Sequence, residues 1–181
     1  MNRRHFSASL LASTGLAACQ GDGAHPLIGK QLPVVKGVFT DGSVFDLSIA
    51  PQPAIVRFWG MWCGPCMMDM PNWLSVIRQL RVGEKALADI NIYTIHVGLP
   101  PANGPSLRQW TAEQQSDVAT PVVDDATSTI MKVVGITGTP STLYIDPNGR
   151  IGEHAWQFKN ERGVDSFIRK VTHLHNKFKP Q

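Results

Sequence analysis

Apolar residues form strand-like patterns in four parts of the chain. Residues 54–60 (AIVRFWG) and 90–97 (INIYTIHV) are nearly continuous runs of apolar, branched and aromatic residues, typical of strands buried on both faces. Residues 32–48 alternate weakly around a Thr-Asp-Gly-Ser turn. Residues 141–156 (STLYIDPNGRIGEHAW) contain two strand-like runs joined by Asp-Pro-Asn-Gly. Each of these last two segments predicts a β-hairpin.

Helical spacing of apolar residues predicts four further elements. One helix starts at Gly64, one covers residues 107–115, one follows a short extended piece within residues 120–136, and the last spans roughly residues 161–177. Pro71 lies inside the first helix and should kink it, because proline lacks an N–H and its ring crowds the preceding turn. The apolar stripes are Met70, Leu74, Ile77 and Leu80 or Arg81 in the first helix, and Val164, Phe167, Ile168, Val171 and Leu174 in the last.

The order of these elements after the first hairpin, β-α-β-α-β-β-α, predicts an α/β fold. An early helical crossover favours parallel strands, and a late hairpin favours antiparallel ones. We therefore expect a mixed central sheet with helices on both faces, plus an N-terminal β-hairpin. The sequence has no internal repeat, low-complexity tract or second domain boundary, so residues 27–181 should form one domain.

Composition and charge narrow the class of protein. The 181 residues are 43% hydrophobic and 17% charged, as in a globular protein with a substantial apolar core. The formal net charge of +3 is small and is not concentrated in a basic run. A nucleic-acid partner is therefore not expected.

The first eighteen residues have the features of an export signal. Arg3 and Arg4 precede the thirteen-residue run FSASLLASTGLAA, which is shorter than the ~20 residues that span a bilayer. The run ends in LAAC, which resembles the lipobox of bacterial lipoproteins, with Cys19 as the acylated residue. The arginine pair partly matches the twin-arginine export pattern. Alternatively, Cys19 is an ordinary small residue of a conventional signal.

These features predict how the protein is held in the cell envelope. Residues 1–18 are expected to be a lipoprotein-type signal peptide and residues 19–26 a lipidated tether. Removing residues 1–18 deletes two arginines and no acids, so the net charge falls from +3 to +1. A lipid, rather than charge, would then hold the exported protein at the membrane. Gln20 does not fit the Asp signal that retains many lipoproteins in the inner membrane, which leaves the choice of membrane open.

The segment WCGPCMMDMP (residues 62–71) places Cys63 and Cys66 two residues apart, between a buried strand and a helix. The first amides of a helix are unpaired and its dipole is positive there, so a thiolate at Cys63 would be stabilised and its pKa lowered. Cys63 is then the expected attacking sulfur. Cys66, one turn later on the covered side, is the expected resolving thiol that closes onto a mixed disulfide. Such a pair needs no cofactor.

The residues around this pair resemble a known family. WCGPC followed by a proline five residues after the second cysteine resembles thioredoxin. FWGMWCGPCMMDMP (58–71) together with TPVVDDATSTIMKVVGITGTPSTLYIDPNGRI (120–151) resembles the exported, membrane-tethered TlpA/ResA branch more closely, over roughly residues 27–175. The resemblance implies a thioredoxin fold and a thiol–disulfide oxidoreductase that acts on disulfides of exported proteins. By analogy it also implies apocytochrome c as a client, and a membrane thiol–disulfide electron carrier as the partner that recharges it.

The same resemblance implies roles for residues around the cysteines. Pro140, after Thr139, falls where the family has its cis-proline, opposite the cysteine pair. A proline there offers no N–H to compete for a nearby sulfur, and it leaves neighbouring backbone free to pair with an extended substrate. Trp62, Gly64 and Pro65 are the other residues expected to contact substrate.

Two charged residues near the cysteines have open interpretations. Asp69 stands on the helix face of Cys66, where the TlpA/ResA pattern often has a Glu, which implies a proton acceptor; otherwise it is a solvated surface residue. Arg57 lies mid-strand, where thioredoxins have an acid and the exported branch commonly a neutral amide. It could pair with Asp69 and favour a thiolate, tuning the potential toward the oxidising side. Alternatively, its head reaches solvent.

Three alternative functions explain the sequence less well. A Cu(I)-binding module is suggested by soft sulfur ligands at Met61, Met67, Met68 and Met70. Copper-delivery relatives typically use CxxxC with a distant histidine, however, and core packing is the favoured interpretation of these methionines. A redox-inert binding domain of the same fold is disfavoured because both cysteines are present. A zinc site is disfavoured because no second cysteine pair exists in the mature chain, so no metal is expected.

Overall fold

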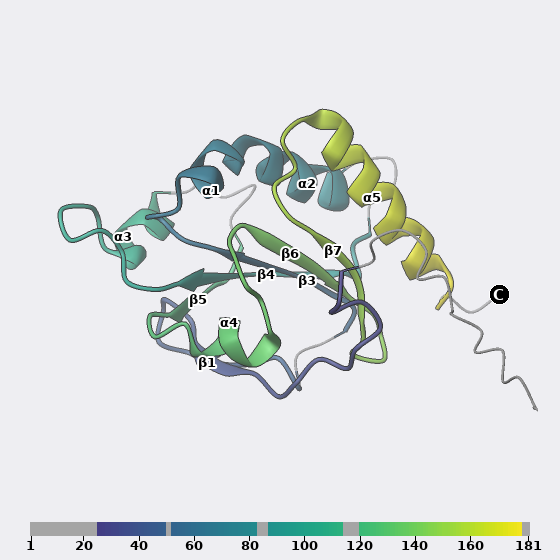
Figure 1. Cartoon of the computed structure of the whole chain (residues 1–181), viewed down its shortest axis with the longest axis horizontal. Helices are drawn as coiled ribbons and strands as arrows, with labels where there is room; N and C mark the ends of the chain where they lie inside the picture. The colour runs from purple at the N-terminus through teal and green to yellow at the C-terminus, as the bar shows by residue number, and fades with distance from the viewer. Residues whose placement is uncertain (1–24, 50–51, 83–86, 114–119, 179–181) are drawn as a thin grey trace, which may run out of the picture.

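The computed structural model describes residues 25–49, 52–82, 87–113 and 120–178 (Figure 1). The strands are β1 (Lys36–Val38), β2 (Val44–Asp46), β3 (Ala54–Trp59), β4 (Asn91–Val97), β5 (Val122–Asp125), β6 (Ser141–Ile145) and β7 (Ile151–Ala155). The helices are α1 (Gly64–Met68), α2 (Met70–Val82), α3 (Leu107–Ala112), α4 (Thr129–Val134) and α5 (Glu161–Asn176). The expected α/β fold is confirmed.

The central sheet is mixed, as the order of elements predicts. Its strands run in the order β5-β4-β3-β6-β7. β3 pairs with β4, and β4 with β5, in parallel, whereas β6 pairs antiparallel with both β3 and β7. β1 and β2 form the expected separate N-terminal hairpin. The helical crossover after β3 thus produces the parallel half of the sheet, and the late hairpin produces the antiparallel half.

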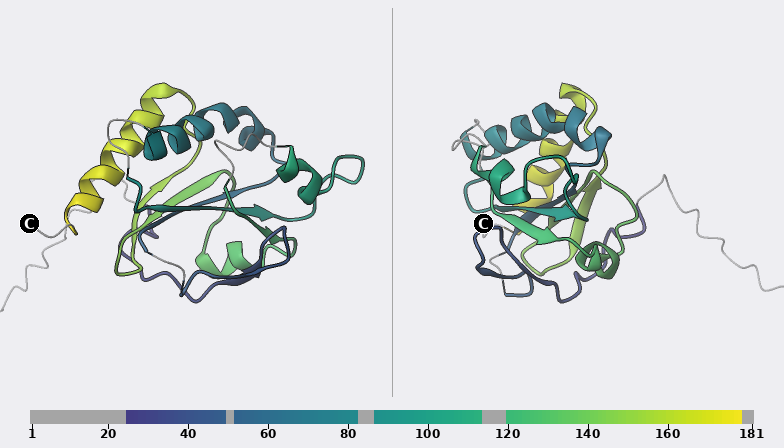
Figure 2. Two further views of the ribbon diagram at one scale, coloured as in Figure 1. Left: turned by 180° about the vertical axis from the view of Figure 1, so that it is seen from behind. Right: turned by 90° about the vertical axis from the view of Figure 1, so that its left-hand side faces the viewer.

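Two helices cover one face of the sheet, and a helix and the N-terminal hairpin cover the other. Figure 2 shows α2 and α5 on one side, with α4 and the N-terminal hairpin on the other. All six residues of β3 are buried and their side chains alternate between the faces. Ile55 belongs to the cluster under α2 and α5, whereas Val56 and Phe58 pack toward α4 and the hairpin. By the same alternation, Arg57 points toward the helical side.

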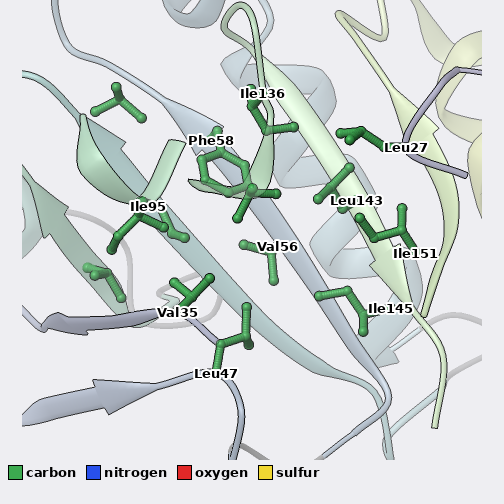
Figure 3. Packing of buried hydrophobic residues seen from close by; sticks show 14 of the residues in the cluster. Leu27, Val35, Leu47, Val56, Phe58, Ile95, Ile136, Leu143, Ile145 and Ile151 are labelled. Carbon is green, nitrogen blue, oxygen red and sulfur yellow. The ribbon is translucent and has the colours of Figure 1, made fainter. Parts of the chain in front are cut away.

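The core on the hairpin side is built mainly from aliphatic side chains. Figure 3 shows Val56 and Phe58 of β3 surrounded by residues from β4, β6, β7 and the N-terminal segment. Its labelled members are Leu27, Val35, Leu47, Val56, Phe58, Ile95, Ile136, Leu143, Ile145 and Ile151. Leu27 and Val35 are 6% and 2% exposed, so the N-terminal segment is an integral part of the domain core.

The helix after the cysteines breaks earlier than expected. We expected a kink caused by Pro71, but α1 ends at Met68 and α2 begins at Met70, so the break is at Asp69. The chain still turns helically there, since the Asp69 N–H donates to Pro65 O (3.1 Å) and the Trp73 N–H donates to Asp69 O (3.0 Å). Proline disturbs the turn that precedes it, which explains why the irregularity is displaced toward the N-terminus.

The last helix closes the fold as its apolar stripe predicts. Four residues of the stripe are buried in α5 and Leu174 packs against the same cluster. At its end, His175 is buried and its Nε2 lies 2.9 Å from Oδ2 of Asp89. No helix within the described ranges is long and apolar enough to span a bilayer. Cys19 and the proposed signal segment lie outside the described residues.

Candidate redox site

Cys63 and Cys66 form a disulfide at the start of α1. The Sγ–Sγ distance is 2.10 Å and the Cα–Cα distance is 5.2 Å. Cys63 is the N-cap of α1 in an extended conformation; its N–H donates to Gly60 O (3.0 Å) and its Sγ accepts from the Cys66 N–H (3.2 Å). The hydrogen bond from the Cys66 N–H to Sγ of Cys63 is the interaction that would stabilise a Cys63 thiolate in the reduced protein.

The two sulfurs differ in access. Cys63 is 5% exposed, whereas Cys66 is fully buried, with 0% exposed. Trp59, Leu107 and Val122 pack with both cysteines in a small apolar cluster. Cys63 is therefore slightly more exposed than Cys66, and its role as the attacking sulfur stays a prediction.

The loop before β6 lies against the disulfide. The Thr139–Pro140 peptide bond is cis, as expected, and Thr139 O is 3.5 Å from Sγ of Cys63. The Ser141 hydroxyl donates to Gly138 O at 2.8 Å and fixes the turn. Residues 76 positions apart are thus brought together at the sulfur.

Trp62 is held over two glycines beside the disulfide. Its indole Nε1 donates to Val97 O at 2.7 Å, and its side chain is 52% exposed. A Cβ at Gly60 would lie 2.6 Å from Nε1, and one at Gly98 would lie 3.1 Å from it. Glycine at these two positions lets the ring lie flat against the backbone, where it borders the approach to Cys63.

Arg57 and Asp69 form a buried ion pair. Nη2 of Arg57 lies 3.1 Å from Oδ2 of Asp69, and both side chains are 0% exposed. The Arg57 guanidinium also contacts the rings of Trp73 (5.1 Å to the centroid) and Phe158 (5.7 Å). Asp69 is therefore not a solvated surface residue, and the head of Arg57 does not reach solvent. Alternation in β3 and the helix turn from Cys66 bring both groups under α2.

The Asp69 carboxylate accepts several hydrogen bonds. It receives the Phe158 N–H on both oxygens (3.1 and 3.2 Å) and Nδ2 of Asn72 on Oδ1 (3.2 Å), besides the Arg57 contact. These hydrogen bonds link the cysteine helix to the segment after β7. Burial lowers the pKa of Arg57, while the charge of Asp69 and its hydrogen bond oppose that shift.

The methionines near the cysteines are only partly core residues. Met61 and Met70 pack against the cysteine cluster, as expected. Met67 and Met68 are 38% and 70% exposed, so core packing is the wrong interpretation for these two. They follow Cys66 on helix positions that turn away from the sheet. Among the described residues, no group of three or more His, Cys, Asp or Glu side chains could hold a metal ion.

Two features of this site have no signal in the sequence pattern. His96, at the end of β4, is fully buried and accepts the Met61 N–H on Nε2 at 3.0 Å. His25 stacks on His154 with ring centroids 3.8 Å apart, and Trp156 packs against His154 at 4.8 Å. The spacing of these residues along the chain is uninformative, because tertiary packing rather than periodicity brings them together.

The chain matches a known protein family and resembles several characterised proteins in sequence. The model of the AhpC/TSA family matches residues 28–154, well over half of the chain, with both cysteines of the pair and Pro140 inside the match. The thiol-disulfide oxidoreductase ResA of Bacillus thuringiensis subsp. konkukian is 23% identical over 146 residues, covering 80% of this chain and 79% of the relative. The thiol:disulfide interchange protein DsbE homolog of Paracoccus denitrificans is 26% identical over 149 residues, covering 80% and 75%.

Solved structures share the fold. A putative thiol:disulfide interchange protein DsbE from Chlorobium tepidum matches with a TM-score of 0.64 at 18% identity, covering 81% of this chain and 96% of that chain. The pneumococcal exposed lipoprotein thioredoxin of Streptococcus pneumoniae matches with a TM-score of 0.58 at 18% identity, covering 78% and 100%. Together, these findings confirm the thioredoxin-like fold, the resemblance to the ResA branch and the thiol–disulfide oxidoreductase class.

Proposed function

The chain belongs to the AhpC/TSA family, and we propose that it is a membrane-tethered, exported thiol–disulfide oxidoreductase that reduces disulfides of exported proteins. The observation that carries this proposal is the Cys63–Cys66 disulfide, with the more accessible sulfur set against the Thr139 carbonyl beside a cis-proline. ResA and DsbE relatives support the reaction class.

In the proposed reaction, the reduced enzyme supplies two electrons. The Cys63 thiolate attacks one sulfur of a substrate disulfide; the new Sγ–S bond forms as the substrate bond breaks, and the leaving sulfur takes the electron pair and then a proton. Cys66 next loses its proton and attacks Sγ of Cys63. The second substrate thiol is released and the Cys63–Cys66 disulfide remains. A membrane thiol–disulfide carrier then returns two electrons and two protons.

The surroundings of Cys63 suggest how a substrate binds. Gly64 and Pro65 are exposed next to the disulfide, and Trp62 borders them. The backbone of Thr139 offers an edge on which an extended substrate segment can pair while its cysteine reaches Sγ of Cys63. Pro140 adds no N–H that would compete for the sulfur.

The buried ion pair is proposed to act on the second step. Cys66 must give up a proton in an apolar setting, and Asp69 lies one helical turn away on the same face. We assign Asp69 the role of proton acceptor and Arg57, its buried ion-pair partner, the role of tuning it. The Gly-Pro within CxxC matches the reducing end of a range from about −270 to about −120 mV, a span of about 7 kcal/mol for two electrons.

The tether is proposed from the sequence and fits the position of the first described residues. We propose residues 1–18 as signal peptide, residues 19–26 as a tether acylated at Cys19, and residues 27–181 as the domain. His25 is six residues from Cys19, a length that reaches about 20 Å when extended. Because His25 stacks on His154, beside the cis-proline loop, an anchor at Cys19 would keep the redox face near the membrane.

Insulin reduction with a chemical electron donor tests the proposed activity. The wild type is expected to reduce insulin, and Cys63→Ser to abolish that activity. Apocytochrome c is proposed as a client by analogy alone. A wild type without activity, or a Cys63–Cys66 reduction potential close to that of the strong periplasmic oxidants, would refute the reductase.

A further inference from the structure

His96 contacts the reactive turn through a hydrogen bond that depends on its protonation state. Nε2 accepts the Met61 N–H at 3.0 Å, and Met61 stands two residues before Cys63. A ring nitrogen can accept only when it carries no proton, so His96 is the neutral tautomer with its hydrogen on Nδ1. The side chain is 0% exposed, so water does not replace this bond.

Three hydrogen bonds hold the turn from Gly60 to Cys63. The Met61 N–H donates to His96, the indole of Trp62 donates to Val97 O at 2.7 Å, and the Cys63 N–H donates to Gly60 O at 3.0 Å. Two of the three acceptors belong to consecutive residues at the end of β4. Of these three bonds, only the one to His96 depends on a group that titrates.

We propose that His96 is a positioning residue for thiol–disulfide exchange at Cys63, and that protonation of its imidazole releases the turn from β4 and slows exchange in acid. The imidazolium carries a hydrogen on both ring nitrogens, so Nε2–H would face the Met61 N–H, donor against donor. The turn must then move, and with it the sulfur that sits against Thr139 O. The identity of the reaction rests on the proposed function.

The groups around His96 explain why it is neutral at rest. Its strand partner on β3 is Trp59, which is uncharged, and its partner on β5 is Asp124. Asp124 and Arg108 of α3 both line a hollow of about 480 Å³. The turn contributes the Cys63 sulfur, and that sulfur is uncharged in the disulfide.

The second ring nitrogen, Nδ1, carries the hydrogen in both the neutral tautomer and the imidazolium, so it does not decide between them. Nδ1 of His96 is buried and has no hydrogen-bond partner within the described part of the chain; the Gly98 carbonyl favours a proton there without completing a hydrogen bond. Burial lowers the pKa of His96, and Asp124 and Gly98 oppose this only in part. The ring therefore stays neutral at neutral pH and can charge only under acid.

The test compares rates of disulfide reduction across pH in matched variants. His96→Gln keeps an acceptor oxygen that does not titrate, His96→Leu removes the acceptor, and His175→Gln alters a buried histidine at the other end of the sheet as a control. All variants share the titration of Cys63, so the informative quantity is the rate of wild type divided by that of His96→Gln. We expect this ratio to be constant above about pH 7 and to fall about tenfold in acid, the factor for one net hydrogen bond.

Two outcomes decide the proposal. The proposal is supported if the ratio falls over the same pH range as the imidazole titration of His96 measured by NMR. His96→Leu should then be about tenfold slower than the wild type even at neutral pH, and the ratio of wild type to His175→Gln should not change with pH. A ratio that is flat with pH overturns it, because a purely structural histidine would change all rates equally. Amide exchange of Met61 in the oxidised protein separates this result from the activity. Acid-accelerated exchange in the wild type but not in His96→Gln preserves the inference about the turn even if no variant reduces a disulfide.

Discussion

The buried pair of Arg57 and Asp69 should be among the most costly polar contacts to break. Both side chains are 0% exposed and their charged atoms are 3.1 Å apart. At an effective dielectric constant of about 20, Coulomb's law gives about 5 kcal/mol for unit charges at that distance. Replacing Asp69 with Asn leaves the Arg57 cation buried without a counter-charge. We expect Asp69→Asn to lower the free energy of unfolding by about 3–5 kcal/mol.

Urea unfolding of the oxidised protein, followed by circular dichroism, measures this loss. A partly exposed pair in the same chain serves as the control: Lys170 and Glu153 lie 3.2 Å apart, and their side chains are 57% and 16% exposed. Lys170→Met should cost at most about 1 kcal/mol. A large difference between the two variants at nearly equal distances would show that burial, rather than proximity, sets the cost.

A double-mutant cycle isolates the pair itself. Arg57→Met combined with Asp69→Asn removes both charges together, so its cost should be smaller than the sum of the single variants by at least about 1 kcal/mol. The reasoning fails if Asp69→Asn costs less than about 0.5 kcal/mol, or if the single changes add within that margin. Either result would mean that Asp69 is not an ion buried against Arg57.

Three further predictions follow from the site and its tether. Burial lowers the pKa of His96 and lowers that of His154 to about 4, whereas an unfolded histidine titrates near 6.5. The unfolded chain therefore binds more protons than the folded chain between these values. Thermal denaturation at several pH values should show a free energy of unfolding that does not change above about pH 7 and that falls from about pH 6.5 toward 4. The Cys66→Ser variant should accumulate mixed disulfides with its substrate, which appear on non-reducing gels and are cleaved by a reducing agent. If none forms with a model disulfide, Cys63 is not the attacking sulfur. Cys19→Ser should move the protein from the membrane to the soluble fraction of the envelope, and unchanged fractionation would refute the lipid anchor.

Most of the fold could be predicted because its signals are local. Continuous apolar runs marked β3 and β4, Asp-Pro-Asn-Gly marked the last hairpin, and the stripe from Val164 to Val171 marked the face that α5 buries. Pro71 predicted an irregularity in this helix, and the break lies at Asp69 because proline acts on the backbone of the preceding turn. Exposure of Met67 and Met68 was missed, because hydrophobicity alone does not say which helix face meets the sheet.

The amino-acid sequence alone determined the reactive pair and its chemistry, because a CxxC between a buried strand and a helix puts a sulfur at the helix start through backbone geometry within a few residues. Tertiary structure decided what surrounds that sulfur. Cys63 meets Thr139 across 76 positions, Met61 meets His96 across 35, and Asp69 meets Phe158 across 89. These contacts arise from strand order and from packing of helices on the sheet, and no local pattern encodes which distant residues share a neighbourhood. For the same reason, Arg57 remained ambiguous until the sheet placed it beneath α2 with its partner.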